Sequence, residues 1–117
     1  MDTKSRDTVE ISVIIYPEDG FWIAQGIEFD ITARGATPVE ASERFNDKVR
    51  AEMVISRELN DELPLSGVGR APAKFLEMYN KAKMRVVDEE FPLPATDGGP
   101  SSRLRARVRI NGEKQAA

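Results

Sequence analysis

Two groups of charged residues carry side chains that could do chemistry. Glu28 and Asp30 stand two positions apart in the segment GIEFD, and converging carboxylates are what a two-metal nuclease needs. A second group alternates with apolar residues in RLRARVRI and consists of Arg103, Arg105, Arg107 and Arg109. Guanidinium groups bind phosphates and carboxylates, so this segment predicts contact with nucleic acid or with an acidic protein surface.

The composition argues against catalysis. The chain of 117 residues contains no histidine and no cysteine, which removes the commonest general base, the Ser-His and Cys-His nucleophile systems and most zinc sites. A carboxylate nuclease remains conceivable, but the other acids do not assemble: Asp19 belongs to a turn and Glu40 to a helix start. We therefore expect a protein that is not an enzyme, with no cofactor and no metal, in which Glu28 and Asp30 are solvated strand residues.

Length and hydropathy predict one compact domain in the cytoplasm. No apolar run approaches the ~20 residues of a membrane span, and the N-terminal MDTKSRDTVE lacks the apolar stretch of a signal peptide. The absence of cysteine agrees with a reducing compartment. We expect no membrane contact.

Three strands are predicted in the first third of the chain. VEISVII at 9–15 alternates, with apolar side chains on one face and Glu10 and Ser12 on the other. YPEDG supplies a turn, and FWIAQGIEFDITA reads as two further strands, at about 21–27 and 29–34. Phe21 and Trp22 face opposite sides of the sheet, so one is expected in the core, and the other is either an exposed interface anchor or also packed in the core. The sequence does not say which.

The stretch ITARGATPVEASERF predicts the start of a helix. Gly35 can adopt a positive φ and turn the chain, Thr37 suits the N-cap, and Pro38 suits the first helical position. Glu40 lies three residues after Thr37 and completes a capping box. The helix should run to about Leu59, because four apolar residues recur at every fourth position and form a buried stripe: Ala41, Phe45, Val49 and Met53.

The remaining elements complete an α/β (α+β) fold, a small antiparallel β-β-β-α-(α)-β sheet with its helices on one face. A second helix is predicted over 72–85, and the Pro-, Gly- and Ser-rich segment 91–102 reads as a connector. The domain proper would then be 1–90. Residues 103–117 form a final arginine-rich strand and tail that complete this chain's sheet or a partner's.

The joint between strands and helix resembles the HicB-like antitoxin family. The motifs are PEDGFWIAQ at 17–25, followed by a third strand and the helix start that contains Gly35, Thr37, Glu40 and Ala41. The resemblance covers about residues 9–56 and implies a partial ribonuclease H-like fold without a working nuclease site. The segment GIEFDITAR departs from the family pattern. No DNA-binding module is visible, because only seven residues follow RLRARVRI.

The resemblance implies that the chain binds and neutralises a HicA-type toxin, a small RNA-cleaving protein, through an acidic surface that covers the toxin's basic face. The residues expected to contribute are Trp22, Glu28 and Asp30. A stand-alone relative without a toxin is the other possibility within the family, as a homodimer or higher oligomer.

The arginine strand leaves three interpretations open. Side chains at i and i+2 on a strand lie about 6.6 Å apart, comparable to the phosphate spacing on one nucleic-acid strand, so the chain could be a nucleic-acid-binding regulator. The arginines could instead meet an acidic protein face or a second subunit. They could also serve only to discourage aggregation at a sheet edge. The segment 103–117 has five basic residues against Glu113, a net charge of +4 in a chain whose total is −3.

Overall fold

The computed structural model describes the backbone of residues 8–58, 65, 68–82, 84–85, 89–93 and 102–111. Side chains are described over the same ranges except at 8, 56–58, 84–85, 89–93 and 102–104. Within these ranges lie six strands, namely β1 (Thr8–Glu18), β2 (Phe21–Gly26), β3 (Thr32–Gly35), β4 (Met84–Arg85), β5 (Glu89–Leu93) and β6 (Ser102–Ile110). The two helices are α1 (Pro38–Glu58) and α2 (Ala73–Lys81), and neither is long and apolar enough to cross a membrane.

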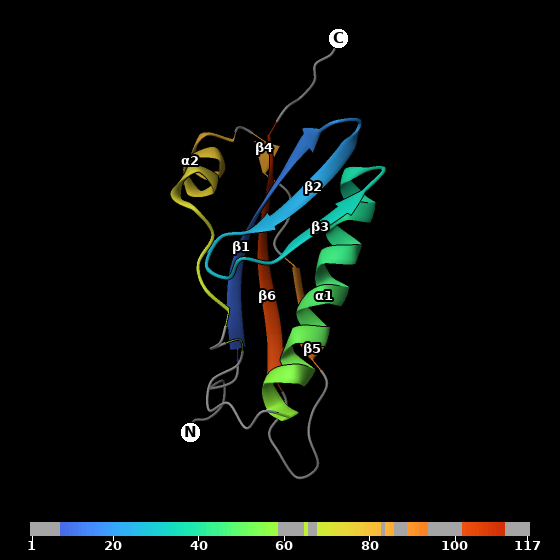
Figure 1. Ribbon diagram of the computed structural model, residues 1–117, viewed down its shortest axis with the longest axis vertical. Helices are drawn as coiled ribbons and strands as arrows, with labels where there is room; N and C mark the ends of the chain where they lie inside the picture. The colour runs from blue at the N-terminus through green and yellow to red at the C-terminus, as the bar shows by residue number, and fades with distance from the viewer. Residues whose placement is uncertain are drawn as a thin grey trace.

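The strands form one mixed sheet in the order β3-β2-β1-β6-β4, with β5 also paired to β6. Figure 1 shows β1 and β6 side by side along the length of the molecule. The predicted α/β class is confirmed, but the sheet is not wholly antiparallel, because β6 runs parallel to β1. Parallel neighbours need a long crossover, and here everything from β2 to β5 lies between the two strands. The predicted final strand is therefore a central strand of this chain's own sheet.

The start of α1 agrees with the sequence-based prediction, with one difference. The Glu40 amide donates to Thr37 Oγ1 over 3.0 Å, so Thr37 is the N-cap. The Glu40 carboxylate reaches back to the amide of Ala36, 2.6 Å away, instead of to the Thr37 amide that a standard capping box uses. Glu40 also pairs with Arg44 one turn later, at 3.1 Å.

Gly35 is required for a reason other than the predicted one. Among the described glycines only Gly20, in the β1–β2 turn, has a positive φ. At Gly35 an added Cβ would lie 2.5 Å from the Ala41 amide nitrogen and 2.8 Å from the Glu40 carbonyl carbon. The end of β3 therefore touches the first turn of α1, and only glycine permits this approach.

The core lies between α1 and one face of the sheet. The four residues of the predicted stripe, Ala41, Phe45, Val49 and Met53, are all buried, which confirms the predicted face of the helix. They pack against the odd-numbered apolar residues of β1 and against Ala106 and Val108 of β6. This single apolar layer holds α1 against the sheet.

The second helix is shorter than predicted and lies on the other face. It ends at Lys81 because Ala82 is extended, with ψ 135°, and the chain then enters β4. The ring of Phe75 lies 6.0 Å from that of Tyr16, and Tyr16 points away from the α1 side because its neighbour Ile15 points toward it. The prediction that both helices pack on one face was wrong, and α2 has no buried residue of its own.

Strands β4 and β5 were not predicted. Both pair antiparallel with β6 on the side away from β1, so residues 91–93 and Ser102, assigned to the connector, belong to strands. Residues 94–101 lie outside the described ranges. The Pro92 in EEFPL argued against a strand from sequence, but β5 pairs with a neighbour only on its β6 side, and proline is tolerated at such an edge.

Candidate functional site

Glu28 has a structural position just beyond the end of β2. The Ile27 amide still donates to the Ser12 carbonyl over 2.9 Å, but the Ile27 carbonyl accepts from the Ala71 amide over 3.1 Å, so the Ser12 amide needs another acceptor. Glu28 Oε1 accepts a hydrogen bond from this amide over 2.7 Å, and Glu28 Oε2 accepts one from Ser12 Oγ over 2.9 Å. The half-buried carboxylate therefore takes the place of the Ile27 carbonyl as the acceptor for Ser12, and it is not the solvated residue that the sequence suggested.

Asp30 fixes the other side of the same loop. Its carboxylate accepts a hydrogen bond from Gln25 Nε2 over 2.7 Å, and Gln25 Oε1 accepts one from Thr32 Oγ1 over 2.7 Å. The Asp30 amide donates to the carbonyl of Gly69 over 2.7 Å. Gln25 is buried, so its amide group needs these partners. Asp30 remains exposed and can contact a second molecule.

The two carboxylates have separate partners in the structure. Over the described residues, no group of three or more acidic side chains is placed to hold a metal ion. Glu28 and Asp30 each bind groups of the sheet instead of facing each other across a cavity. The described geometry thus uses both carboxylates as hydrogen-bond acceptors for backbone and side-chain groups.

The structure separates the two adjacent aromatic residues. Trp22 is half-buried and packs against the core, whereas Phe21 is 42% exposed, with the guanidinium of Arg34 4.6 Å from the centre of its ring. Trp22 lies at the start of β2, and Glu28 follows its end, so at about 3.3 Å per residue some 13 Å of strand separate them. The three residues expected to contact a partner are therefore spread along β2 and the loop that follows it.

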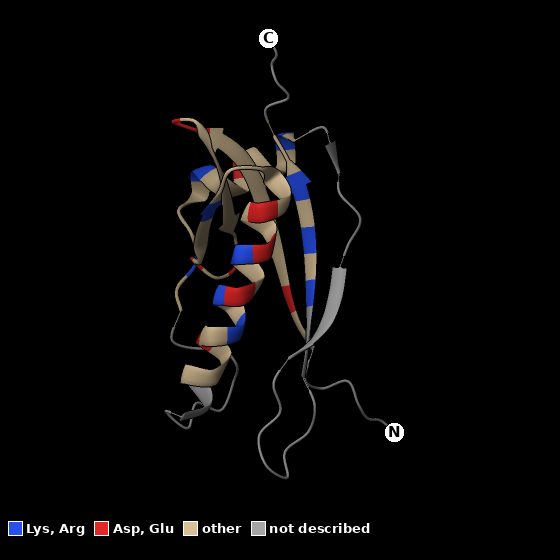
Figure 2. Ribbon diagram, turned by 90° about the vertical axis from the view of Figure 1, so that its right-hand side faces the viewer, with Lys and Arg blue, Asp and Glu red and all other residues tan. Residues whose placement is uncertain are grey.

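The arginine strand lies on the face of the sheet opposite α1. The register places Arg105 opposite Glu10, Arg107 opposite Ser12 and Arg109 opposite Ile14. Arg105 and Arg107 approach the same Glu10 carboxylate, at 3.7 and 3.3 Å, and each side chain is 47% exposed. Figure 2 shows the basic positions recurring along β6. The side chain of Arg103 lies outside the described set.

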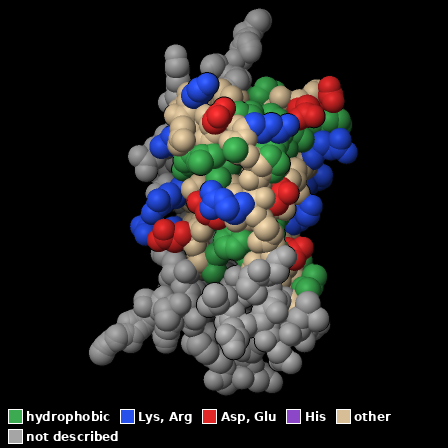
Figure 3. All heavy atoms as spheres, turned by 60° about the vertical axis from the view of Figure 1, so that its left-hand side comes forward, with side chains coloured by type: hydrophobic (Ala, Val, Ile, Leu, Met, Phe, Trp, Pro, Cys, Tyr) green, Lys and Arg blue, Asp and Glu red, His purple; other side chains and the backbone are tan. Residues whose placement is uncertain are grey.

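Arg109 is engaged differently from the other two. Its Nη1 donates to the carbonyl of Tyr79 over 2.9 Å, and its guanidinium lies 4.3 Å from the centre of the Tyr79 ring. This residue therefore attaches α2 to the sheet and is less available to a ligand. Figure 3 shows the surface on the α2 side, where basic, acidic and hydrophobic side chains are interspersed.

Tyr16 is the described group with a clearly shifted pKa. Burial raises the pKa of its phenol, and the nearby Glu18 carboxylate, which also hydrogen-bonds the phenol, raises it further. Sequence reasoning missed Glu10, Tyr16 and Tyr79 as members of this face. The alternation of 9–15 placed Glu10 on the polar side, but only the parallel pairing with β6 brings it to the arginines.

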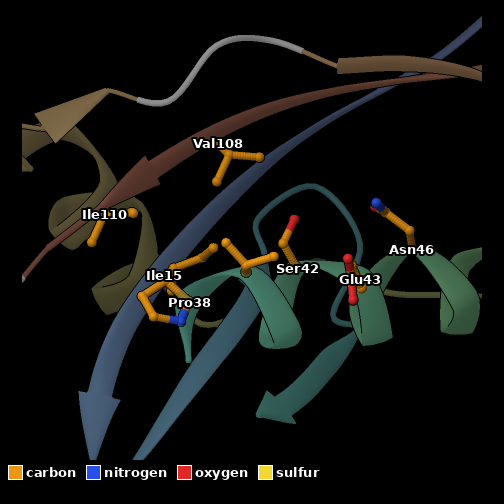
Figure 4. A pocket seen from close by; sticks show the side chains of 8 residues that line it. Ile15, Pro38, Ser42, Glu43, Asn46, Val108 and Ile110 are labelled. Atoms are coloured by element: carbon orange, nitrogen blue, oxygen red, sulfur yellow. The ribbon is translucent and has the colours of Figure 1, made fainter. Parts of the chain in front are cut away.

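A groove lies on the opposite face, between α1 and the strands β1 and β6 (Figure 4). It has a volume of about 150 Å³. The sheet contributes apolar side chains and α1 contributes a mixed rim, and the lining residues are Ile15, Val108, Ile110, Pro38, Val39, Ser42, Glu43 and Asn46. The polar groups sit on the helix alone, so the groove offers an apolar floor without the converging polar groups typical of a specific ligand site.

Comparison of the chain with protein-family models, with curated proteins and with solved structures finds no match.

Proposed function

We propose that the chain is a non-catalytic protein-binding module of the HicB-like antitoxin type. The observation that supports this most directly is the joint between strands and helix. Three consecutive antiparallel strands lead into a helix capped by Thr37, and Gly35 is held against the first turn of that helix. These are the positions on which the resemblance to the family depends.

The proposed activity is neutralisation of a HicA-type toxin by covering its RNA-binding surface. Asp30 is exposed and is the acidic residue of the original set best placed to meet a basic partner. Glu28 acts in this proposal by holding the loop of residues 27–31 in place. Trp22 supports the sheet from the core side, so the exposed Phe21 replaces it as the aromatic contact.

The decisive experiment is purification of the tagged chain from its native cell, followed by identification of what copurifies. The proposal expects a small basic protein in stoichiometric amount, and ribonuclease activity of that protein that falls to zero when the chain is added in equal amount. The Asp30→Lys variant should weaken the inhibition about tenfold, since it places a like charge at the contact. Absence of a copurifying basic protein, or ribonuclease activity unaffected by the chain, would refute the proposal.

A second candidate function is nucleic-acid binding through β6. The observation in its favour is the half-exposed pair Arg105 and Arg107 on one face of one strand, where both approach the Glu10 carboxylate. Binding of this kind weakens steeply with salt. Titration of labelled RNA and DNA at several salt concentrations tests it, and the Arg105→Ala plus Arg107→Ala variant should abolish the binding. Retention of full affinity by this variant would exclude β6 as the contact.

The remaining parts of the proposal concern assembly and location. We propose a homodimer or higher oligomer in the cytoplasm, and the oligomer could be the final form if no toxin exists. Sedimentation of the purified chain over a range of concentrations measures the assembly. A monomer at every concentration would remove oligomerisation from the proposal and leave the toxin interaction untouched.

A further inference from the structure

Strand β3 forms one edge of the sheet, and basic side chains of α1 bind its outward-facing backbone carbonyls. Alternate residues of β3 pair with β2, so Thr32 and Arg34 turn their backbone groups away from the sheet. The Thr32 carbonyl accepts a hydrogen bond from Lys48 Nζ over 2.6 Å, and the Arg34 carbonyl accepts one from Arg44 Nη1 over 3.3 Å. Two basic side chains of α1 therefore occupy the outward acceptors of this edge.

The surroundings of the edge carry an excess of positive charge. A shallow depression beside β3 is lined by Arg34, Arg44 and Lys48 and by one acidic residue, Asp47. The Asp47 carboxylate already accepts a hydrogen bond from Arg50 over 2.9 Å. Arg44 and Lys48 come from α1 on one face of the sheet, whereas Arg34 lies with Phe21 on the other. A strand added at this edge would thus have basic groups on both sides.

We propose that the β3 edge is a docking edge for an acidic, extended segment of a partner protein. Pairing with β3 requires the amides of the incoming strand to reach the carbonyls of Thr32 and Arg34, which displaces Lys48 and Arg44. Among the contacts of the described residues, a neutral strand takes from Lys48 its acceptor on β3 and leaves Arg44 with its ion pair to Glu40. A strand with carboxylate side chains accepts them in new ion pairs, so the same two side chains exclude neutral strands and admit acidic ones.

A second copy of this chain does not fit the same edge. Two-fold pairing of β3 with its counterpart would bring Arg34, Arg44 and Lys48 of both copies together, against the two carboxylates of Glu40 and Asp47 from each. Like charges directly opposite one another destabilise a strand pair. A nucleic acid supplies negative charge but no peptide groups for pairing, so the backbone ladder distinguishes it from an acidic peptide.

The test uses a fluorescent peptide in which glutamate and valine alternate, with binding to the full chain followed by anisotropy. The same peptide with N-methyl groups on alternate residues has equal charge but cannot complete the ladder. The proposal expects the unmodified peptide to bind, more weakly at higher salt, and the N-methylated peptide to bind about tenfold more weakly. No binding by the unmodified peptide, or equal binding by both peptides, would overturn it. The proposal would also be overturned if a DNA oligonucleotide displaced the peptide and bound the chain as tightly as the peptide does.

Variants assign the site. Replacement of both Arg44 and Lys48 by glutamine should lower the affinity for the acidic peptide about fivefold, because the two ion pairs are lost. The matched control replaces two cations of α2, Lys74 and Lys81, which removes the same charge at a distance from the β3 edge and should change the affinity less than about twofold. Equal losses in the two double variants would mean that net charge alone attracts the peptide. Circular dichroism verifies that both variants remain folded.

Discussion

Removal of the Glu28 carboxylate should destabilise the fold, because this side chain gives the Ser12 amide an acceptor in place of the Ile27 carbonyl, which bonds Ala71. Glu28→Ala leaves the Ser12 amide without an acceptor in a half-buried position and removes a second hydrogen bond to Ser12 Oγ. Hydrogen bonds to charged groups contribute about 1.5–3 kcal/mol each when well shielded. Since Glu28 is only half-buried, we expect a combined loss of about 2 kcal/mol.

Glu28→Gln provides a graded comparison. Its amide oxygen can still accept from the Ser12 amide and its nitrogen can donate to Ser12 Oγ, so both contacts remain but neither is charge-assisted. The expected loss is about 1 kcal/mol. Ser12→Ala removes only the side-chain contact, and its effect combined with that of Glu28→Ala should be less than additive because the two share that bond.

Urea unfolding followed by the fluorescence of Trp22, the one tryptophan in the chain, measures these effects. With a slope of about 1.5 kcal/mol per molar urea, a loss of about 2 kcal/mol lowers the midpoint by about 1.3 M. Glu77→Ala on the exposed surface of α2 is the control and should shift the midpoint by no more than about 0.3 M. If Glu28→Ala unfolds at the same urea concentration as Glu77→Ala, the structural role assigned to Glu28 is wrong.

Three further predictions concern other parts of the fold. Thr37→Ala should cost about 1 kcal/mol in urea unfolding through loss of the helix cap, whereas Thr37→Ser should be close to neutral; equal losses would mean that the cap contributes nothing. Gly35→Ala should cost about 2 kcal/mol or more, because its Cβ would meet the Ala41 backbone, and a thermal midpoint equal to that of the original chain would refute this. The raised pKa of Tyr16 means that the folded state holds the phenolic proton more tightly than the unfolded state, so this contribution to stability is complete below about pH 10 and falls as pH rises through the folded-state pKa. Between neutral and strongly alkaline pH, the free energy of unfolding of Tyr16→Phe should therefore fall less than that of the original chain. If the free energies of the two proteins fell in parallel with pH, the raised pKa assigned to Tyr16 would be wrong.

The candidate site shows why residue types alone assigned roles imperfectly. Glu28 and Asp30 were selected because paired carboxylates can bind metals or basic partners, but their neighbours were unknown. The local sequence does not contain the information that the Ile27 carbonyl bonds the amide of Ala71, more than forty residues later, and this contact gives Glu28 its partner. Likewise, the alternation of RLRARVRI defined an arginine face, while the pairing of Glu10 with two of those arginines depends on a strand more than ninety residues earlier in the chain.

By itself the sequence determined the elements whose causes are local. Alternation defined the first strand, and the recurrence of apolar residues at every fourth position defined the buried face of α1. Thr37 with Pro38 defined the start of that helix, because each of these signals depends on groups only a few residues away. The tertiary structure decided the parallel placement of β6, the position of α2 on the far face and the choice between Phe21 and Trp22 as the exposed ring. It also decided why residue 35 must be glycine. These features depend on which segments meet across the sheet, and no local propensity encodes that.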